Sequence, residues 1–256
     1  MAKTKAKKDG GVVETVKTVV YAVLIAIGIR TVAYEPFNIP SESMLPTLLV
    51  GDYLFVSKFS LGYSRFSLPF DLGQLLPAVG RIPAWAPERG DVAVFKLPRD
   101  NSTDYIKRII GLPGDRIQMK GGALFLNGVE VPRRRVADFR YEGRFGNERV
   151  PQYVETLPNG KSYNTLDLRP NSSTDDTGVY VVPPGHVFAM GDNRDNSLDS
   201  RVSPNDNPPG VGFVPMENLV GRADVLFFST DGSASIFEPW KWPFATRYSR
   251  IFNAVD

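Results

Sequence analysis

Frequent glycine and proline residues are the sequence feature that most constrains the fold of this chain. They account for 23 and 21 of its 256 residues, and they fall in clusters between short apolar runs. Such punctuation favours many strands joined by turns over long helices. A chain of this length can also bury a substantial core, as one large domain or two modest ones. We therefore expect a mostly β protein.

The apolar runs are long enough for strands and are bounded by turn residues. Strands are expected over Gly51–Phe59, Gly90–Leu97, Asp104–Gly111 and Gly178–Asn193, with two more over Gly212–Phe228. Ala123–Val131 is expected to form a hairpin, because Asn127-Gly128 is a preferred pair for a type I′ turn. Residues Pro132 to Thr177 are polar and irregular, which indicates an inserted, mostly β subdomain or a long excursion.

The N-terminus joins a basic tail to an apolar segment. Four lysines lie within the first eight residues, and the uncharged stretch Thr18–Ile29 follows. That stretch is shorter than the ~20 residues needed to cross a bilayer. Extending it to Val12–Tyr34 supplies the length, with charged residues near the ends, where Lys and Arg can reach the headgroups. Three interpretations fit: a retained anchor with a cytoplasmic tail, a signal peptide cleaved after Ala33, and a soluble or interfacial helix.

Composition narrows the function classes. The net charge of +2 is too small and too evenly spread for a nucleic-acid binder. The chain has no cysteine and a single histidine, His186, so neither a zinc site nor any other metal or cofactor is expected. A Ser–His–Asp triad could use only His186, which lies in an apolar strand pattern typical of a structural residue. A nucleophilic enzyme without histidine needs another base, and lysine is the usual substitute.

Two segments carry a candidate nucleophile and a candidate base. Ser43 lies in PSESMLPTLLVGD (Pro40–Asp52), on a proline-bounded turn just after the apolar segment. Lys107 lies in DYIKRIIGLPGD (Asp104–Asp115), where strand alternation places it on the opposite face from Arg108. Taken singly, Ser43 is also an ordinary turn residue and Lys107 an ordinary edge-strand lysine facing water.

A third polar segment, GDNRDNSLDSR (Gly191–Arg201), has the composition of a solvated turn or a calcium loop. An EF-hand does not fit, because Leu198 would occupy its required glycine and Pro204 its required glutamate.

Together, the three segments resemble the signature boxes of bacterial type I signal peptidases (leader peptidases), a Ser–Lys serine peptidase family. They occur in the family's order and spacing, with the hydrophobic segment directly before the serine box. The resemblance covers Tyr34–Gly128 and Gly178–Arg250. It implies a signal-peptidase-type, β-barrel-like catalytic core with an inserted β-rich subdomain and one N-terminal transmembrane helix. The expected division is a basic cytoplasmic tail (1–11), an anchor (12–34), the first part of the core (35–131), the insertion (132–177) and the second part of the core (178–256).

The resemblance also implies a role for each matching residue. Ser43 would be the nucleophile and Lys107 the general base. The Ser41 hydroxyl and the Ser43 N–H would form the oxyanion hole, and Ser197 would orient the lysine amine. Asp199 and Arg201 match a structural ion pair beside the site. The implied substrate-binding residues are Phe37, Ile39, Pro40, Met44, Leu48, Asp104, Tyr105 and Ile106. Glu42 stands where some members have glycine, which alters the charge at the pocket mouth more than the chemistry.

The chemistry requires Lys107 to be uncharged. At a reference pKa near 10.4, well under ~1% of a lysine is free amine at neutral pH. Burial among apolar neighbours can lower that pKa by up to ~3–5 units, so that the amine can accept the serine proton.

The implied substrates are exported preproteins with small side chains at the −3 and −1 positions. The implied location is the bacterial cytoplasmic (inner) membrane, with a single span, a cytoplasmic N-terminus and the catalytic domain on the outer (periplasmic) side. Membrane lipid would be a partner, the secretion translocon a neighbour, and nucleic acid no partner. The aromatic segments Phe66–Trp85 and Phe227–Phe252 fit either a membrane interface or a core.

Two alternatives stay open, namely a dedicated Ser–Lys peptidase such as one that processes conjugation pilins, and a non-enzymatic β-rich surface or calcium-binding module. Self-cleaving repressors are disfavoured, because the hydrophobic segment occupies the place of their DNA-binding helices.

Overall fold

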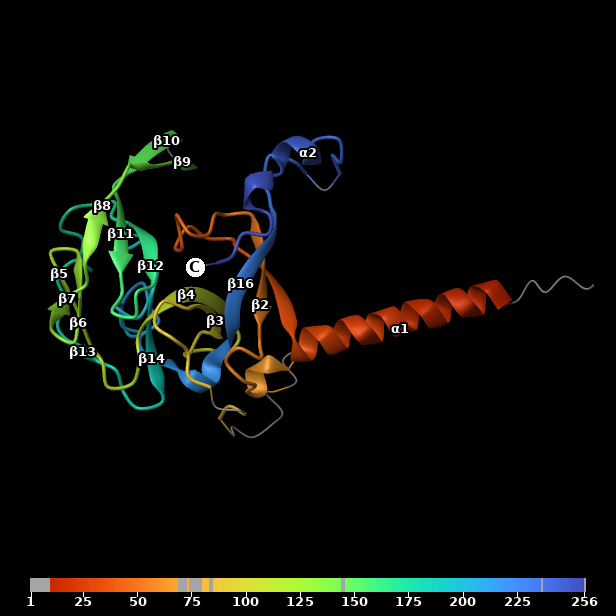
Figure 1. Cartoon of the computed structure of the whole chain (residues 1–256), viewed down its shortest axis with the longest axis horizontal. Coiled ribbons are helices and arrows are strands. Elements are labelled where there is room, and N and C mark those ends of the chain that lie inside the picture. Colours follow the sequence, from red (N-terminus) through yellow and green to blue (C-terminus); the bar gives the residue numbers. More distant parts are fainter. Residues whose placement is uncertain are drawn as a thin grey trace, which may run out of the picture.

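The computed structural model describes residues 10–68, 73, 80–82, 85–143, 146–235 and 237–255. One long helix, α1 (Gly10–Val32), extends from a body built mostly of β-strands (Figure 1). The only other α-helix among these residues is a single turn, α2 (Trp242–Ala245). The expectation of a mostly β fold with one N-terminal apolar helix is confirmed.

Helix α1 has the dimensions of a membrane span. Its 23 residues give a helix about 35 Å long, which exceeds the ~30 Å thickness of the hydrocarbon core of a bilayer. Within Gly11–Val32 an 18-residue stretch has a mean hydropathy of 2.0, and none of that stretch is buried against the body. By length and composition it is the one helix in the described part of the chain that could cross a membrane. It ends two residues earlier than expected, because Tyr34 already begins a strand.

The body is centred on a seven-stranded antiparallel sheet with the order β1-β2-β16-β3-β4-β14-β15. Its strands are β1 (Tyr34–Asn38), β2 (Asp52–Ser57), β3 (Val92–Lys96), β4 (Asp104–Gly111), β14 (His186–Met190), β15 (Val214–Pro215) and β16 (Leu219–Ser229). A short 3-10 turn, Met216–Asn218, separates β15 from β16, so Gly212–Phe228 does form two strands. The sheet curls, and each of its two faces carries a buried cluster. Alternate residues of β3 divide between them, with Val92 and Val94 in the cluster around β2–β3–β16 and Ala93 and Phe95 in the cluster around β3–β4–β14.

Three smaller sheets form a second lobe beside this sheet (Figure 1). The first contains β5 (Arg116–Lys120), β6 (Ala123–Leu126), β7 (Val129–Glu130) and β13 (Tyr180–Val181), the second β8 (Arg133–Arg135), β11 (Gln152–Thr156) and β12 (Ser162–Leu166), and the third β9 (Phe139–Gly143) and β10 (Gly146–Val150). The β6–β7 turn has positive φ at both Asn127 (55°) and Gly128 (84°), as a type I′ turn requires. A third cluster, which includes Ile110 of β4 and Leu124 of β6, joins the lobe to the sheet.

The aromatic segment Phe66–Trp85 lies partly outside the described residues. Within the described part, Phe66 is buried in a 3-10 turn (Arg65–Ser67) and Trp85 is exposed. That turn begins at a capping box. The Ser64 side chain accepts a hydrogen bond from the Ser67 backbone amide, and the Ser67 side chain accepts one from the Ser64 amide.

Candidate active site

The turn that carries Ser43 connects β1 to β2 and is fixed by burial. Met44 and Leu48 are 1% and 0% exposed and belong to the cluster around β2, β3 and β16. The backbone is held as well, because the amide of Asn193 donates to the Ser43 carbonyl at 3.1 Å. The Ser43 side chain is itself buried, and its Oγ lies 3.4 Å from the Ser41 hydroxyl.

Lys107 comes to this turn from β4, in the middle of the large sheet. The distance between its Nζ and the Ser43 Oγ is 2.7 Å, and Nζ also donates to the Ile106 carbonyl at 2.9 Å. Two residues 64 positions apart thus form a direct side-chain contact. Alternation along β4 holds as expected, since Lys107 meets Ser43 while Arg108 points to other partners.

The surroundings of Lys107 favour its neutral form. Only 4% of the residue is exposed, and this burial lowers the pKa of Lys107 from 10.5 to about 8. The carboxylates of Asp199 and Asp192 oppose that shift by attracting the ammonium, whereas the Arg201 guanidinium adds to it. The amine also lies 5.3 Å from the centroid of the Tyr105 ring. Desolvation is the largest of these effects, as expected for an amine in an apolar site.

The segment Gly191–Arg201 completes the site. Asp199 and Arg201 form an ion pair at 2.9 Å in which both side chains are fully buried, and the Asp199 carboxylate also accepts from the Gly191 amide at 2.9 Å. Ser197 lines the same cavity as Ser43 and Lys107. Its hydroxyl is buried and makes no hydrogen bond with any described residue.

Gly191 is where the serine turn and this segment touch. A Cβ added there would lie 2.4 Å from the Ser197 Oγ and 2.5 Å from the Ser43 carbonyl oxygen. Both distances are far below van der Waals contact, so only glycine leaves room for the two serines to approach.

A cavity of about 880 Å³ opens at the Ser43–Lys107 pair. One side of it is largely apolar, and this side includes Phe37, Ile39, Pro40, Val94, Tyr105 and Ile106, with Asp104 beside them. The other side is polar and is formed by residues 169–174 together with Arg194, Asp195, Asn196 and Ser197. Of the expected substrate-binding residues, Met44 and Leu48 do not line the cavity, because they pack in the core beneath the serine turn.

Sequence reasoning gave no role to two buried arginines near the site. Arg108 forms a bidentate ion pair with Asp192 at 2.8 and 2.7 Å, and it stacks on the Tyr163 ring at 4.2 Å. The same carboxylate accepts from the Thr47 hydroxyl at 2.5 Å, which ties the serine turn to β4. Arg194 pairs with Glu155 in the same bidentate way. The sequence held one signal for such a pair, namely Arg108 inside an apolar strand. A buried charge is rarely tolerated without a partner of opposite charge, so this position indicates a buried ion pair.

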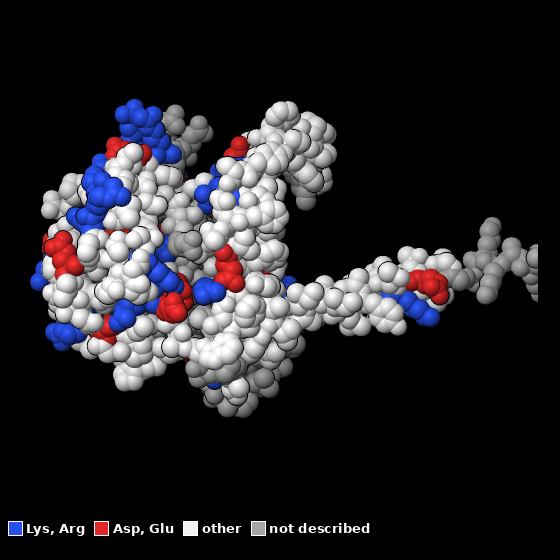
Figure 2. Space-filling view, viewed as in Figure 1, with Lys and Arg blue, Asp and Glu red and all other residues white. Residues whose placement is uncertain are grey.

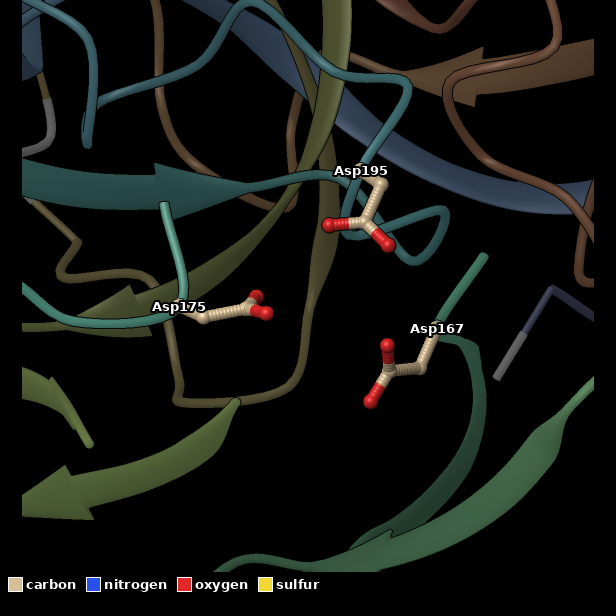
Figure 3. Close-up of side chains that lie close together, drawn as sticks. All are labelled: Asp167, Asp175 and Asp195. Carbon is tan, nitrogen blue, oxygen red and sulfur yellow. The ribbon is translucent and has the colours of Figure 1, made fainter. Parts of the chain in front are cut away.

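Three aspartates on the polar side, Asp167, Asp175 and Asp195, lie within 4.8 Å of one another (Figure 3). Burial and the other two carboxylates raise the pKa of Asp167. Asp195 accepts hydrogen bonds from the amides of Leu168 and Arg169 at 2.7 and 2.9 Å, and Asp175 accepts from the amide of Ser172 at 2.8 Å. Asp175 and Asp195 therefore hold the cavity-lining loop in shape.

His186 lies away from the pair. It begins β14, its Nδ1 is 3.0 Å from the Pro184 carbonyl oxygen, and it does not line the cavity. The described residues that line the cavity include no histidine that could act as a base. The basic group that contacts the Ser43 hydroxyl is the Lys107 amine.

The family model described as "Signal peptidase, peptidase S26" matches residues 12–228. The chain belongs to the S26 signal peptidases.

Relatives of known function align with this S26 peptidase along most or nearly all of its length. It is 39% identical to signal peptidase I of Rickettsia typhi over 99% of this chain and 97% of that protein. It is 42% identical to signal peptidase I of Rickettsia canadensis over 89% of this chain and 84% of that protein. A crystal structure of a signal peptidase I from Enterococcus faecalis is 25% identical, with a TM-score of 0.31, over 54% of this chain and 97% of that one.

Membership of the family establishes the broad activity. The chain is a hydrolase of the signal peptidase I type, which cleaves signal peptides as a serine peptidase. Its substrates are therefore preproteins that carry signal peptides. The apolar helix α1 fits a membrane-anchored enzyme. The resemblance seen in the three sequence boxes is confirmed.

Proposed function

We propose that this S26 peptidase uses a Ser–Lys dyad, with Ser43 as nucleophile and Lys107 as general base. The observation that carries the proposal is the distance of 2.7 Å between the Lys107 Nζ and the Ser43 Oγ in a buried site. A pKa of about 8 for Lys107 leaves a useful fraction of neutral amine near neutral pH.

The proposed reaction has two stages. The neutral Lys107 amine takes the Ser43 proton while Oγ attacks the scissile carbonyl, and the resulting ammonium protonates the leaving amine. The acyl-enzyme is then hydrolysed by a water that Lys107 deprotonates in turn. Ser197 is proposed to hold the amine in line, and Asp199 with Arg201 to fix the segment that carries Ser197. The position of Ser197 in the cavity that Ser43 and Lys107 also line supports its role.

The oxyanion hole is proposed to consist of the Ser43 N–H and the Ser41 hydroxyl. The Ser43 N–H makes no hydrogen bond to a described residue, and the Ser41 Oγ lies 3.4 Å from the Ser43 Oγ. An N–H without a described acceptor and a hydroxyl beside the nucleophile support this assignment. Loss of one such donor typically costs about 2.7–4 kcal/mol of transition-state stabilisation.

We also propose that the enzyme cleaves after small residues at −3 and −1. The apolar side of the cavity supports this proposal, because Phe37, Ile39, Tyr105 and Ile106 would surround the residues before the scissile bond. Pro40 and Asp104 would line the rim, while Met44 and Leu48 would support the pockets from the core.

The proposed location is the bacterial cytoplasmic membrane. Helix α1 would span it once, with the basic tail in the cytoplasm and the β body on the outer side, in contact with lipid and near the translocon. The four lysines of the tail support this orientation. Residues 132–177 are proposed to form an insertion between the two parts of the catalytic core.

Cleavage of a purified preprotein by the full-length enzyme tests the dyad. We expect Ser43→Ala and Lys107→Ala to lower kcat by on the order of 10³-fold or more, because the two residues act as a unit. His186→Ala should keep most of the activity. The opposite pattern, with His186 essential and Lys107 dispensable, would replace the dyad by a triad.

A further inference from the structure

The proposed chemistry assigns no role to the insertion at residues 132–177, yet its strands β11 and β12 reach the back of the active site. Figure 1 shows β12 beside β4, the strand that carries Lys107. The contact includes the Tyr163 ring of β12, on which the Arg108 guanidinium of β4 stacks at 4.2 Å. The insertion therefore touches the residue next to the proposed base.

The insertion also packs against the serine turn. Leu45 of that turn forms a buried cluster with Val150 of β10 and Leu166 of β12. The partly buried Leu49, at the other end of the turn, packs against the same cluster. The turn that carries the proposed nucleophile is thus supported by the insertion as well as by the cluster around β2, β3 and β16.

A short backbone pairing connects the end of β12 to the segment Gly191–Arg201. Leu166 forms a parallel bridge with Asn193. The Leu166 amide donates to the Asp192 carbonyl at 2.9 Å, and the Arg194 amide donates to the Leu166 carbonyl at 3.0 Å. The last residue of β12 is therefore bonded on both sides of Asn193.

Asn193 passes this contact on to the nucleophile. Its amide donates to the Ser43 carbonyl at 3.1 Å, and its side chain donates to the Glu42 carbonyl at 3.0 Å. The residue is 0% exposed, so it has no free space in which to adjust. A movement of β12 would consequently be transmitted to the Ser43 backbone.

A buried ion pair fixes this junction in place. Arg194 donates to both oxygens of the Glu155 carboxylate on β11, at 2.7 Å from Nη1 to Oε1. The Tyr163 hydroxyl donates to the same carboxylate at 2.9 Å. Burial raises the pKa of Tyr163, so this hydroxyl stays protonated and remains a donor. One carboxylate of the insertion thus collects three hydrogen bonds behind the active site.

This pair differs from the charges on the surface of the second lobe. Figure 2 shows side chains of both signs there, where water screens an ion pair and its contribution is small. Glu155 and Arg194 are only 1% and 5% exposed. Two apolar residues could fill the same space without loss of stability, but they would not fix the direction of approach as a bidentate pair does. The pair is therefore better explained by geometry than by stability.

We propose that Glu155 and Tyr163 are positioning residues for cleavage, which act through Arg194 and Asn193 to hold the serine turn at its distance from β4. Neither of the two lines the cavity, so neither touches a reacting atom. This inference rests on the proposed function for the Ser–Lys dyad. It makes the insertion part of the framework of the active site.

The pH profile of kcat/KM for the full-length enzyme in detergent, with a purified preprotein, tests this role. Glu155→Gln keeps the size of the side chain but breaks the bidentate contact with Arg194. Once the serine turn moves away from β4, water reaches Lys107, and its pKa rises from about 8 towards the ordinary value of 10.5. We expect the midpoint of the profile to move up by about one pH unit. We expect kcat to fall about tenfold, since small misplacement of a reacting group is costly.

The sign of the shift separates positioning from other effects. Asp199, Asp192 and Arg201 are the charged groups of the described chain that shift the pKa of Lys107, and all three stay in place. Loss of a carboxylate that acted on Lys107 directly would lower its pKa, because the ammonium would lose an attracting charge. A smaller amount of folded enzyme would lower the rate at every pH and leave the midpoint near 8.

Asp115→Asn is the matched control, because it makes the same carboxylate-to-amide change in another ion pair of low exposure. Asp115 is 6% exposed, pairs with Arg89 at 2.5 Å and accepts from the Leu112 amide at 2.7 Å. None of these three residues lines the cavity. The control should unfold at a lower temperature, with kcat and the pH midpoint unchanged.

An unchanged or lowered midpoint in Glu155→Gln, with the wild type near 8, would overturn the inference alone. A wild-type profile without a midpoint near 8 would contradict the dyad, and the inference with it. Where Glu155→Gln shows no cooperative unfolding transition, Tyr163→Phe takes its place, because it removes one hydrogen bond and keeps the ion pair. A smaller upward shift is expected for Tyr163→Phe, and the absence of any shift would overturn the inference.

Discussion

The state of one proton on Lys107 decides the rate in the proposed mechanism. Burial lowers the pKa of this amine to about 8, so the base form is scarce at pH 6 and predominates at pH 9. The value of kcat/KM for preprotein cleavage should therefore rise with pH and level off above a midpoint near 8. Initial rates between pH 6 and 10 measure this profile. A midpoint near 6.5, typical of histidine, would point to a different base.

The close packing at Gly191 gives a second prediction at this scale. Gly191→Ala should abolish most activity, because the new Cβ would push apart the Ser43 backbone and the Ser197 hydroxyl. Gly178→Ala is the matched control, since a Cβ there meets nothing within 4 Å. Preprotein cleavage assays on both variants, with thermal unfolding as a check on the fold, measure the difference. Near-normal rates for Gly191→Ala would mean that the two segments are not held as tightly as described.

At single residues, prediction from sequence is strongest where chemistry constrains residue type, and the structure brings the two predicted side chains, Ser43 and Lys107, within 2.7 Å of each other, while their catalytic roles stay a prediction. Ser43 and Lys107 were predicted from their sequence boxes, and burial gives the physical reason for a neutral amine. The partners of Arg108 could not be predicted, because Asp192 and Tyr163 come from distant segments whose approach depends on the tertiary fold.

Among the elements, the strands were easier to predict than the ends of the apolar helix. The anchor was expected to run to Tyr34, yet Tyr34 begins β1, and Pro36 lies inside that strand, opposite Phe55. Proline is accepted there because β1 is an edge strand, where a missing amide donor leaves no gap in the ladder. The pattern of residues 132–177 predicted β structure but not its arrangement in small separate sheets.

The ion pair between β4 and the loop after β14 can be tested through stability. Arg108→Met leaves the Asp192 carboxylate, 1% exposed, without its guanidinium, so we expect a loss of about 3–5 kcal/mol in the free energy of unfolding. Arg116→Ala on the exposed start of β5 should change it by less than about 0.5 kcal/mol. Denaturant unfolding in detergent measures both. The double variant Arg108→Met/Asp192→Leu should recover part of the loss, because it leaves no unpaired charge.

At the scale of the whole molecule, the lack of cysteine makes the topology directly testable. Ala6→Cys in the basic tail should resist a membrane-impermeant maleimide in intact cells with a permeabilised outer membrane. Val129→Cys, at the exposed start of β7 in the second lobe, should react under the same conditions. Both should react after lysis. Labelling of Ala6→Cys alone in intact cells would reverse the proposed orientation.

The contacts of Arg250 with the serine turn have a consequence for how the enzyme matures. Arg250 binds the fully buried Asp52 carboxylate at 2.6 Å and the Thr47 carbonyl, joining groups separated by 198 positions in one contact. If the β body lies outside the membrane as proposed, a chain that is still crossing the membrane lacks this contact until Arg250 has crossed. With that proposed topology, the serine turn should become fixed, and the enzyme active, only after most of the β body has crossed.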